Sequence, residues 1–190
     1  LEDIHQIYHE DRNIYDFYLR GKTRAFLKKY LGIGTSESKI IPNEYIFNDI
    51  ETRLSLLQGL LDSDGSVLKR GDCEFSSKSK ELAKQVRWLI ESLGGYATIK
   101  SKKTFYTKNG IRKDTGITYR VHFTMVDPRY NPFRMPRKAE LIKFRDKYKE
   151  DIYIENVTYL REDYTKCILI DSDDHLYLTE DFIVTHNTSL

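Results

Sequence analysis

The stretch Leu57-Gln58-Gly59-Leu60-Leu61-Asp62-Ser63-Asp64-Gly65 decides the fold of the larger part of this 190-residue chain. Its leucines continue an apolar face that begins upstream, and Asn48 or Asp49 can cap a helix over residues 50–61. The residues after Leu61 then break the helix. Both carboxylates stand at this break, where a hard cation accepts carboxylate and phosphate oxygens together. A helix with an acidic last turn and no metal is the alternative.

Helices and strands alternate outward from this point. The pattern predicts helices over residues 16–30, 80–93 and 139–148, a strand over 66–75 with a turn at 70–72, and strands over 96–106 and 118–124 joined by an Asn109-Gly110 turn. From residue 152 onward, β-branched and aromatic residues alternate with polar ones. We therefore expect an α+β fold followed by an all-β tail (residues 151–190).

Composition excludes several classes of protein. Apolar residues make up 39% of the chain and aromatic residues 13%, which is enough to bury a core. No apolar run approaches the roughly 20 residues that cross a bilayer, and the start does not resemble a signal peptide. Cys73 and Cys167 are too few and too far apart for a disulfide framework or a zinc site, and we interpret Cys73 as structural. We expect a cytoplasmic protein of a prokaryotic or phage-type context, with no membrane partner.

Charge is distributed unevenly. The tail has nine acidic and two basic residues, a net charge of −7, whereas the first 150 residues carry +9. Bases interleave with aromatic residues in the predicted strand-turn-strand segment, and such a ribbon fits the major groove of double-stranded DNA. Two solvated faces are the alternative. The candidate DNA-binding residues are Lys100, Lys102, Lys103, Lys108, Arg112, Lys113 and Arg120.

The stretch that ends at Gly65 resembles the LAGLIDADG motif of homing endonucleases, and two more blocks accompany it in the family's order. Lys39-Ile40-Ile41-Pro42 resembles the family's Lys-x-Ile-Pro block, and residues 81–94 resemble the helix after the motif. The resemblance implies that Asp64 is the metal-binding carboxylate, with Mg²⁺ as cofactor of the endonuclease. It implies that Lys39 helps to activate water or stabilise the phosphorane, and that Asp62 supports the turn. A plain surface lysine is the alternative for Lys39.

The stretch from His175 to the sequence His186-Asn187-Thr188 resembles the C-terminal splicing blocks of inteins, which are Hint-type protein-splicing domains. In these blocks the Asn amide attacks its own backbone carbonyl and releases the segment beyond it. The resemblance makes Asn187 the cyclising residue and Thr188 the nucleophile that accepts the upstream extein. His186 polarises the scissile carbonyl or protonates the leaving amine, and His175 activates the Asn amide, since an imidazole titrates near neutrality. Splicing itself needs no cofactor.

Cys167 stands where many inteins have an Asp that assists the acyl shifts. We interpret it as this modulating residue, with a buried structural thiol as the alternative and Asp171 as a weaker substitute. Residues 188–190 are then the start of the C-extein. Their sequence, Thr-Ser-Leu, would continue a phosphate-binding loop of a host P-loop ATPase.

The resemblance divides the chain into four parts. Residues 1–132 are the second half of an endonuclease region, 133–150 a connector that resembles the Asn-Pro-Phe-Arg-x-Pro-Arg-Lys passage of such inteins, 151–187 the C-terminal splicing segment and 188–190 extein. An initiating Cys or Ser, a Thr-x-x-His block and a first motif helix are missing. We therefore expect a split or truncated intein that needs a complementary N-terminal fragment to splice in trans.

Three alternatives stay open from the sequence. The motif helix could pair with a second copy in a homodimer, as single-motif endonucleases do. The chain could be a DNA-binding or DNA-cleaving homing protein whose splicing tail is vestigial. It could also be a pure interaction module, which would make both motifs coincidences.

Overall fold

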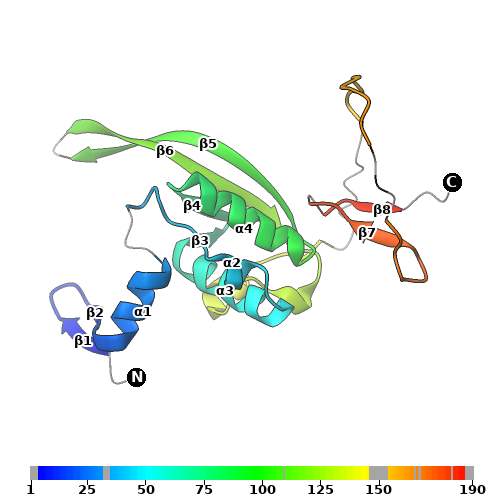
Figure 1. Cartoon of the computed structure of the whole chain (residues 1–190). Coiled ribbons are helices and arrows are strands. Elements are labelled where there is room, and N and C mark those ends of the chain that lie inside the picture. Colours follow the sequence, from blue (N-terminus) through cyan, green and yellow to red (C-terminus); the bar gives the residue numbers. More distant parts are fainter. Residues whose placement is uncertain are drawn as a thin grey trace.

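The computed structural model describes residues 4–31, 35–108, 110–145, 154–164, 166, 168–180 and 182–186, with the backbone alone at 27–31 and 108. Its centre is a four-stranded antiparallel sheet of order β3-β4-β6-β5 (Figure 1). The strands are β3 (Gly65–Val67), β4 (Cys73–Ser77), β5 (Tyr96–Lys108) and β6 (Ile111–Thr124). The helices α3 (Ile50–Asp64) and α4 (Lys80–Ser92) pack against this sheet, and α2 (Asn43–Ile46) precedes α3.

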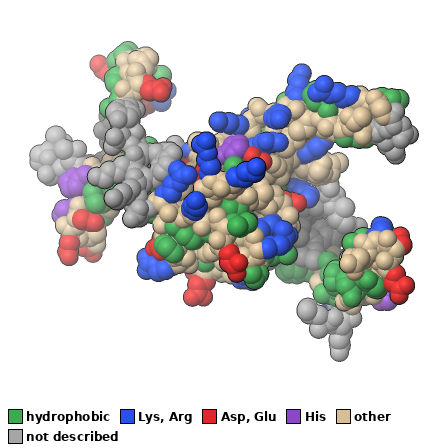
Figure 2. Space-filling model, turned by 180° about the vertical axis from the view of Figure 1, so that it is seen from behind, with side chains coloured by type: hydrophobic (Ala, Val, Ile, Leu, Met, Phe, Trp, Pro, Cys, Tyr) green, Lys and Arg blue, Asp and Glu red, His purple; other side chains and the backbone are tan. Residues whose placement is uncertain are grey.

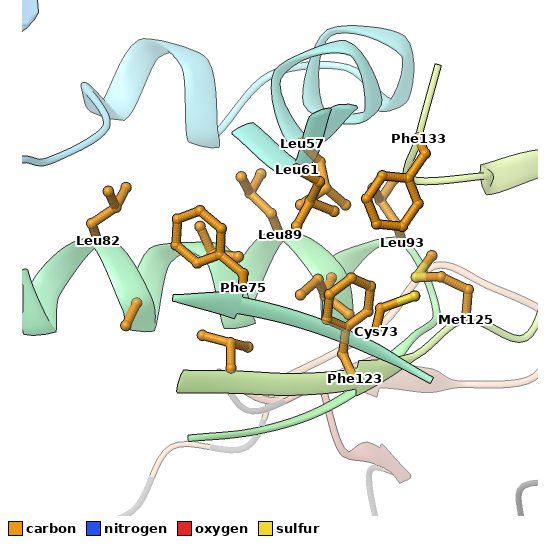
Figure 3. Close-up of a cluster of buried hydrophobic side chains, with 14 of the residues drawn as sticks. Leu57, Leu61, Cys73, Phe75, Leu82, Leu89, Leu93, Phe123, Met125 and Phe133 are labelled. Atoms are coloured by element: carbon orange, nitrogen blue, oxygen red, sulfur yellow. The ribbon is translucent and has the colours of Figure 1, made fainter. Parts of the chain in front are cut away.

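The core lies between the helices and the sheet (Figure 3). Leu57 and Leu61 of α3 are 0% exposed, and they meet strand residues that alternate toward the helices, such as Phe75 and Val121. Full burial of each such side chain stabilises the fold by about 1.5–3 kcal/mol. The 3.6-residue period of the helices and the 2-residue period of the strands therefore build one hydrophobic layer.

Side-chain caps determine where the two main helices begin. Asp49 accepts a hydrogen bond from the Thr52 backbone N–H at 2.8 Å, so Asp49 rather than Asn48 caps α3. These hydrogen bonds hold the pKa of Asp49 below its ordinary value. Ser79 caps α4 by accepting from the Leu82 N–H at 3.1 Å. The predicted helices over 50–61 and 80–93 are confirmed, except that α3 continues through Asp64.

The expected helix over residues 16–30 is wrong in its first part. The chain forms a hairpin of β1 (Ile4–His9) and β2 (Ile14–Leu19), and α1 (Gly21–Leu31) begins only after it. Aromatic and β-branched residues favour strands when a neighbouring strand can pair with them. Tyr8 and Tyr15 make such a cross-strand pair, with ring centroids 4.6 Å apart.

The connector also differs from the expectation. A single helical turn, α5 (Pro136–Ala139), replaces the expected helix over 139–148, and the described residues after it are not helical. Residues 142–145 instead attach to the sheet region, where the Arg145 N–H donates to the Met125 carbonyl at 3.1 Å. Arg145 also pairs with Asp72 at 2.8 Å. Residues 146–148 lie outside the described part of the chain.

Only a short hairpin represents the expected all-β tail. β7 (Leu176–Leu178) pairs with β8 (Val184–His186), and the described residues 154–164 and 168–170 form no strand. Ile154 and Tyr159 are both 83% exposed. An apolar alternation becomes a strand only when a second strand supplies hydrogen bonds and a second layer covers its face. The described tail has neither at these positions.

Candidate functional site

The end of the motif helix leaves no room for a side chain at Gly65. Gly65 is the C-cap of α3 and the first residue of β3, and a Cβ there would meet the Leu61 carbonyl oxygen at 2.6 Å. A Cβ at Gly59, by contrast, would meet nothing within 4 Å. A glycine at this position lets a second helix approach closely, but no such helix lies against Gly59 among the residues that the structure describes.

Asp62 connects this helix end to the connector. Its carboxylate accepts the backbone N–H of Arg134 at 3.2 Å and that of Met135 at 3.2 Å. Nearby, the Arg134 side chain donates from Nε to Gln58 at 2.7 Å and from a terminal nitrogen to Ser55 at 2.9 Å. Asp62 thus joins the end of the motif helix to the connector, and its role in supporting the turn stays a prediction.

Lys138 is a residue of this site that sequence reasoning missed. Its ammonium donates to the backbone carbonyls of Leu61 at 2.9 Å, Asp62 at 2.7 Å and Gly65 at 2.7 Å. The side chain is buried, and burial together with nearby Arg137 lowers its pKa, while Asp62 and Asp64 act in the opposite direction. A cation at a helix C-terminus stabilises the unpaired carbonyls. The only sequence signal was its place in the Arg134–Lys138 passage.

Asp64 projects into the open at this helix end. It is exposed, and its carboxylate makes no hydrogen bond or ion pair within the described residues. Those residues also contain no group of three or more His, Cys, Asp or Glu side chains that could hold a metal ion. Mg²⁺ commonly takes only one or two carboxylates and completes its coordination with water and substrate phosphates. A lone exposed carboxylate fits one ligand of such a site.

Lys39 lies at the same end of the fold. Its backbone carbonyl accepts the Ser79 hydroxyl at 2.6 Å, which places it beside the start of α4. Register brings this region close to Asp64, because Gly65 pairs with Phe75, two residues before the end of β4. Lys39 is exposed, and no contact in the described part of the chain joins its ammonium to Asp64.

The predicted DNA-binding residues divide between the two faces of the β5–β6 hairpin, where Lys and Arg gather along the projecting end (Figure 2). Lys100 pairs with Arg120 across the sheet, and Lys102 follows on the same face of β5. Lys103 points to the other face, as does Arg112, whose guanidinium stacks on the Phe105 ring at 3.9 Å.

Two of the candidate DNA-binding positions lie toward the turn of the β5–β6 hairpin. Lys113 pairs with Tyr106 nearer the hairpin end, beyond the register shift between Lys103 and Phe105 that separates the two parts of the ladder. The Lys108 side chain lies outside the described residues.

Glu74 is an acidic residue in the middle of this basic face, and sequence reasoning did not single it out. Its carboxylate lies 3.6 Å from Arg120 and 3.4 Å from His122. The Arg120 Nε is buried and has no hydrogen-bond partner among the described residues. The ion pair with Glu74 therefore restrains the Arg120 side chain in the centre of the sheet. Arginine is a residue type that commonly contacts base edges in the major groove.

The two candidate splicing histidines lie close together. His175 directly precedes β7, and His186 ends β8 opposite Leu176. Their ring centroids are 6.2 Å apart and the rings are nearly perpendicular, at 86°. His175 adopts a left-handed backbone with φ of 52°, and its Nδ1 lies 3.2 Å from the Ile170 carbonyl oxygen. Asn187, Thr188 and Cys167 lie outside the described residues.

Cys73 behaves as the sequence predicts. It is fully buried in the core, and burial with nearby Asp72 raises the pKa of its thiol to about 12. A thiol of this kind stays protonated and unreactive at neutral pH.

Comparison with known proteins supports the prediction of an endonuclease region in this chain. Residues 51–125 match the model of the LAGLIDADG-like domain. This LAGLIDADG-like region (residues 51–125) contains α3, the sheet and α4, and the match supports the expected homing endonuclease region. The chain is also 31% identical over 163 residues to the replicative DNA helicase DnaB of Mycobacterium intracellulare. The aligned part covers 83% of this chain but only 27% of that helicase.

No helix in the described part of the chain is long and apolar enough to cross a membrane.

Proposed function

We propose that this chain is the C-terminal part of an intein with an embedded LAGLIDADG endonuclease region, and that it acts in protein splicing. The observation that carries the proposal is the pairing of His175 and His186 at the base of one hairpin, directly before Asn187-Thr188. The similarity to part of a DnaB helicase supports it, because an intein gene is read within the gene of its host protein. A helicase also agrees with an ATPase as the source of the exteins.

The proposed reaction at the end of the chain is cyclisation of Asn187. Its side-chain nitrogen attacks its own backbone carbonyl, a succinimide forms, and the peptide bond to Thr188 breaks. His186 protonates the leaving amine or polarises the carbonyl, and His175 accepts a proton from the attacking amide. Thr188 supplies the hydroxyl that receives the upstream extein, and Cys167 modulates the preceding acyl shifts.

A complementary intein segment is part of this proposal. The described tail exposes Tyr164 to 103% and Leu169 to 93% of their reference areas, and its hairpin exposes Leu178 to 58%. Apolar side chains at this exposure indicate a face that another layer covers. The segment can come from the same longer chain or from a separate one.

For the LAGLIDADG-like region we propose DNA binding through the face of the sheet opposite the helices, which carries Lys100, Lys102 and Arg120. In this proposal Asp64 is the metal ligand and Lys39 lies beside the scissile phosphate. Mg²⁺, when bound, would neutralise the charge on the transferring phosphoryl group. The open surface at Gly59 is where a second motif helix would pack, from the complementary part or from a second copy. DNA cleavage by this chain alone should therefore be weak or absent, since only one of the two motif carboxylates is present.

A second candidate function is a DNA-binding homing protein with a vestigial splicing tail. The contrast between the complete helix–sheet core and the exposed tail favours it. Genomic context separates the two, because a neighbouring reading frame with an initiating Cys and a Thr-x-x-His block supports splicing in trans.

The decisive experiment mixes the chain with a complementary N-terminal intein segment and follows the products by mass spectrometry. The chain should release the Thr188-Ser189-Leu190 end and join it to the N-extein. Asn187→Ala should block release, Thr188→Ala should abolish ligation but permit release, and His175→Ala or His186→Ala should slow release by roughly 10²–10⁴. Release of the C-extein by the Asn187→Ala chain would contradict the proposal.

A further inference from the structure

An aromatic cluster on the LAGLIDADG-like region and its preceding turn contains no residue of the motif stretch and no candidate DNA-binding residue. Trp88 of α4 lies beside Phe47, which follows α2, with ring centroids 5.2 Å apart in an edge-to-face arrangement. The Arg53 guanidinium of α3 lies 5.9 Å from the centre of the Trp88 ring. We call Phe47, Arg53 and Trp88 the Trp88 seat. Phe47 is 69% exposed, so the seat faces outward.

One side chain of the tail occupies this seat. Phe182 lies with its ring centroid 5.2 Å from that of Trp88, at an interplanar angle of 60°. Many apolar side chains of the tail are largely exposed, whereas Phe182 is partly buried. Trp88 thus lies between an aromatic ring of its own region and one of the tail, with an edge-to-face contact to Phe47 and a tilted contact to Phe182.

The backbone that presents Phe182 is held in an unusual conformation. Phe182 has a φ of 58°, in the left-handed region that residues with a Cβ rarely adopt. Its N–H donates to the Thr179 carbonyl at 3.0 Å, and the Thr179 N–H donates to the Ile183 carbonyl at 3.0 Å. Such a conformation persists only where surrounding contacts over-determine it. Here the turn and the Trp88 ring together supply those contacts.

We propose that the Trp88 seat is a docking surface for the 179–183 turn, through which the LAGLIDADG-like region orients the hairpin that carries His175 and His186. Phe182 precedes His186 by four residues, and β8 connects them directly. The opposite net charges of the tail and the first 150 residues favour this association. Phe182 and Trp88 are therefore positioning residues, and their effect on cyclisation rests on the proposed splicing function.

The docking itself is testable without splicing, because Trp88 is the chain's single tryptophan. In the full chain, Phe182→Ala should shift Trp88 emission to the red and increase its quenching by acrylamide. The equilibrium constant for docking should fall by roughly two- to tenfold, the range that one aromatic pair provides. Phe182→Tyr should restore the wild-type signal. Phe17→Ala removes an exposed ring from β2 and should leave Trp88 unchanged. Identical quenching in Phe182→Ala and wild type would overturn the docking.

The positioning role requires a second measurement, the rate of C-extein release with a complementary N-terminal segment. Phe182→Ala and Trp88→Leu should each slow release by about two- to tenfold, and the double variant should be no slower than either. Circular dichroism verifies that each variant is folded. Wild-type rates in Trp88→Leu, or fully additive losses, would overturn the positioning role. A wild-type chain that releases nothing would contradict the proposed function, while the quenching result still decides the docking.

Discussion

Leucine side chains have opposite environments in the LAGLIDADG-like region and in the tail. Leu57 and Leu61 are 0% exposed, whereas Leu160 is 85% and Leu169 93% exposed. Both regions have apolar residues at a regular period, so hydrophobicity alone does not distinguish them. In the first region two helices find a sheet to cover, while the described tail offers only a hairpin of three paired positions. An apolar period therefore defines a face, and burial of that face requires a second layer.

Truncation of one leucine in each region tests this comparison with the largest expected effect. Leu61→Ala should lower the free energy of unfolding by about 2–5 kcal/mol, because it removes buried contacts and leaves a cavity. Leu169→Ala should change it by less than about 0.5 kcal/mol. Urea denaturation followed by circular dichroism measures both. Similar losses would show that the tail is packed in solution.

The contacts of Lys138 test whether a buried ammonium stabilises the end of the motif helix. Lys138→Met should lower the free energy of unfolding by about 1–3 kcal/mol, since three carbonyls lose their charged donor. Arg137→Met changes the exposed neighbour and should have an effect within about 0.5 kcal/mol. If the two variants are equally stable in urea, the ammonium does not stabilise the helix end.

The two faces of the β5–β6 hairpin can be compared with two lysines of the same strand. Lys100→Ala should reduce the slope of log affinity against log salt by about 0.9, the value for one lost phosphate contact. Lys103→Ala removes the same charge from the opposite face and should leave the slope almost unchanged. Fluorescence anisotropy with a labelled DNA duplex over a salt series gives both slopes. Equal slopes for the two variants would mean that DNA does not distinguish the faces.

The smallest expected effect concerns the cap of α3. Because hydrogen bonds from Thr52 lower the folded-state pKa of Asp49 below 3.8, its charged form stabilises the fold above the unfolded pKa. This stabilisation is lost as the pH falls through the folded-state pKa. Asp49→Asn keeps a capping oxygen but does not titrate, so its unfolding free energy should decrease less steeply with acid below about pH 4. Glu155→Gln, on the exposed tail, should keep the wild-type pH profile.

Sequence patterns predicted the elements that depend on nearby residues. The starts of α3 and α4 lay close to their predicted positions, and the structure shows that Asp49 and Ser79 cap them, each bonding to an N–H three residues ahead. The same patterns misjudged residues 16–19, where pairing with the neighbouring strand β1 overrode a weak helical period. The all-β tail stays unconfirmed beyond the β7–β8 hairpin, because the pairing of a strand depends on a partner that its own sequence does not contain.

The motif helix with its acidic end, the basic strand-turn-strand segment and the order His175, His186, Asn187 follow from the sequence, because all of them are local features of the chain. Only the tertiary structure decided that Lys138 binds the end of α3, that Lys100 and Lys103 face opposite sides, and that Phe182 lies on Trp88. Each of these joins segments far apart in sequence or depends on which face the helices cover. Such contacts follow from how the layers pack, and no local period encodes them.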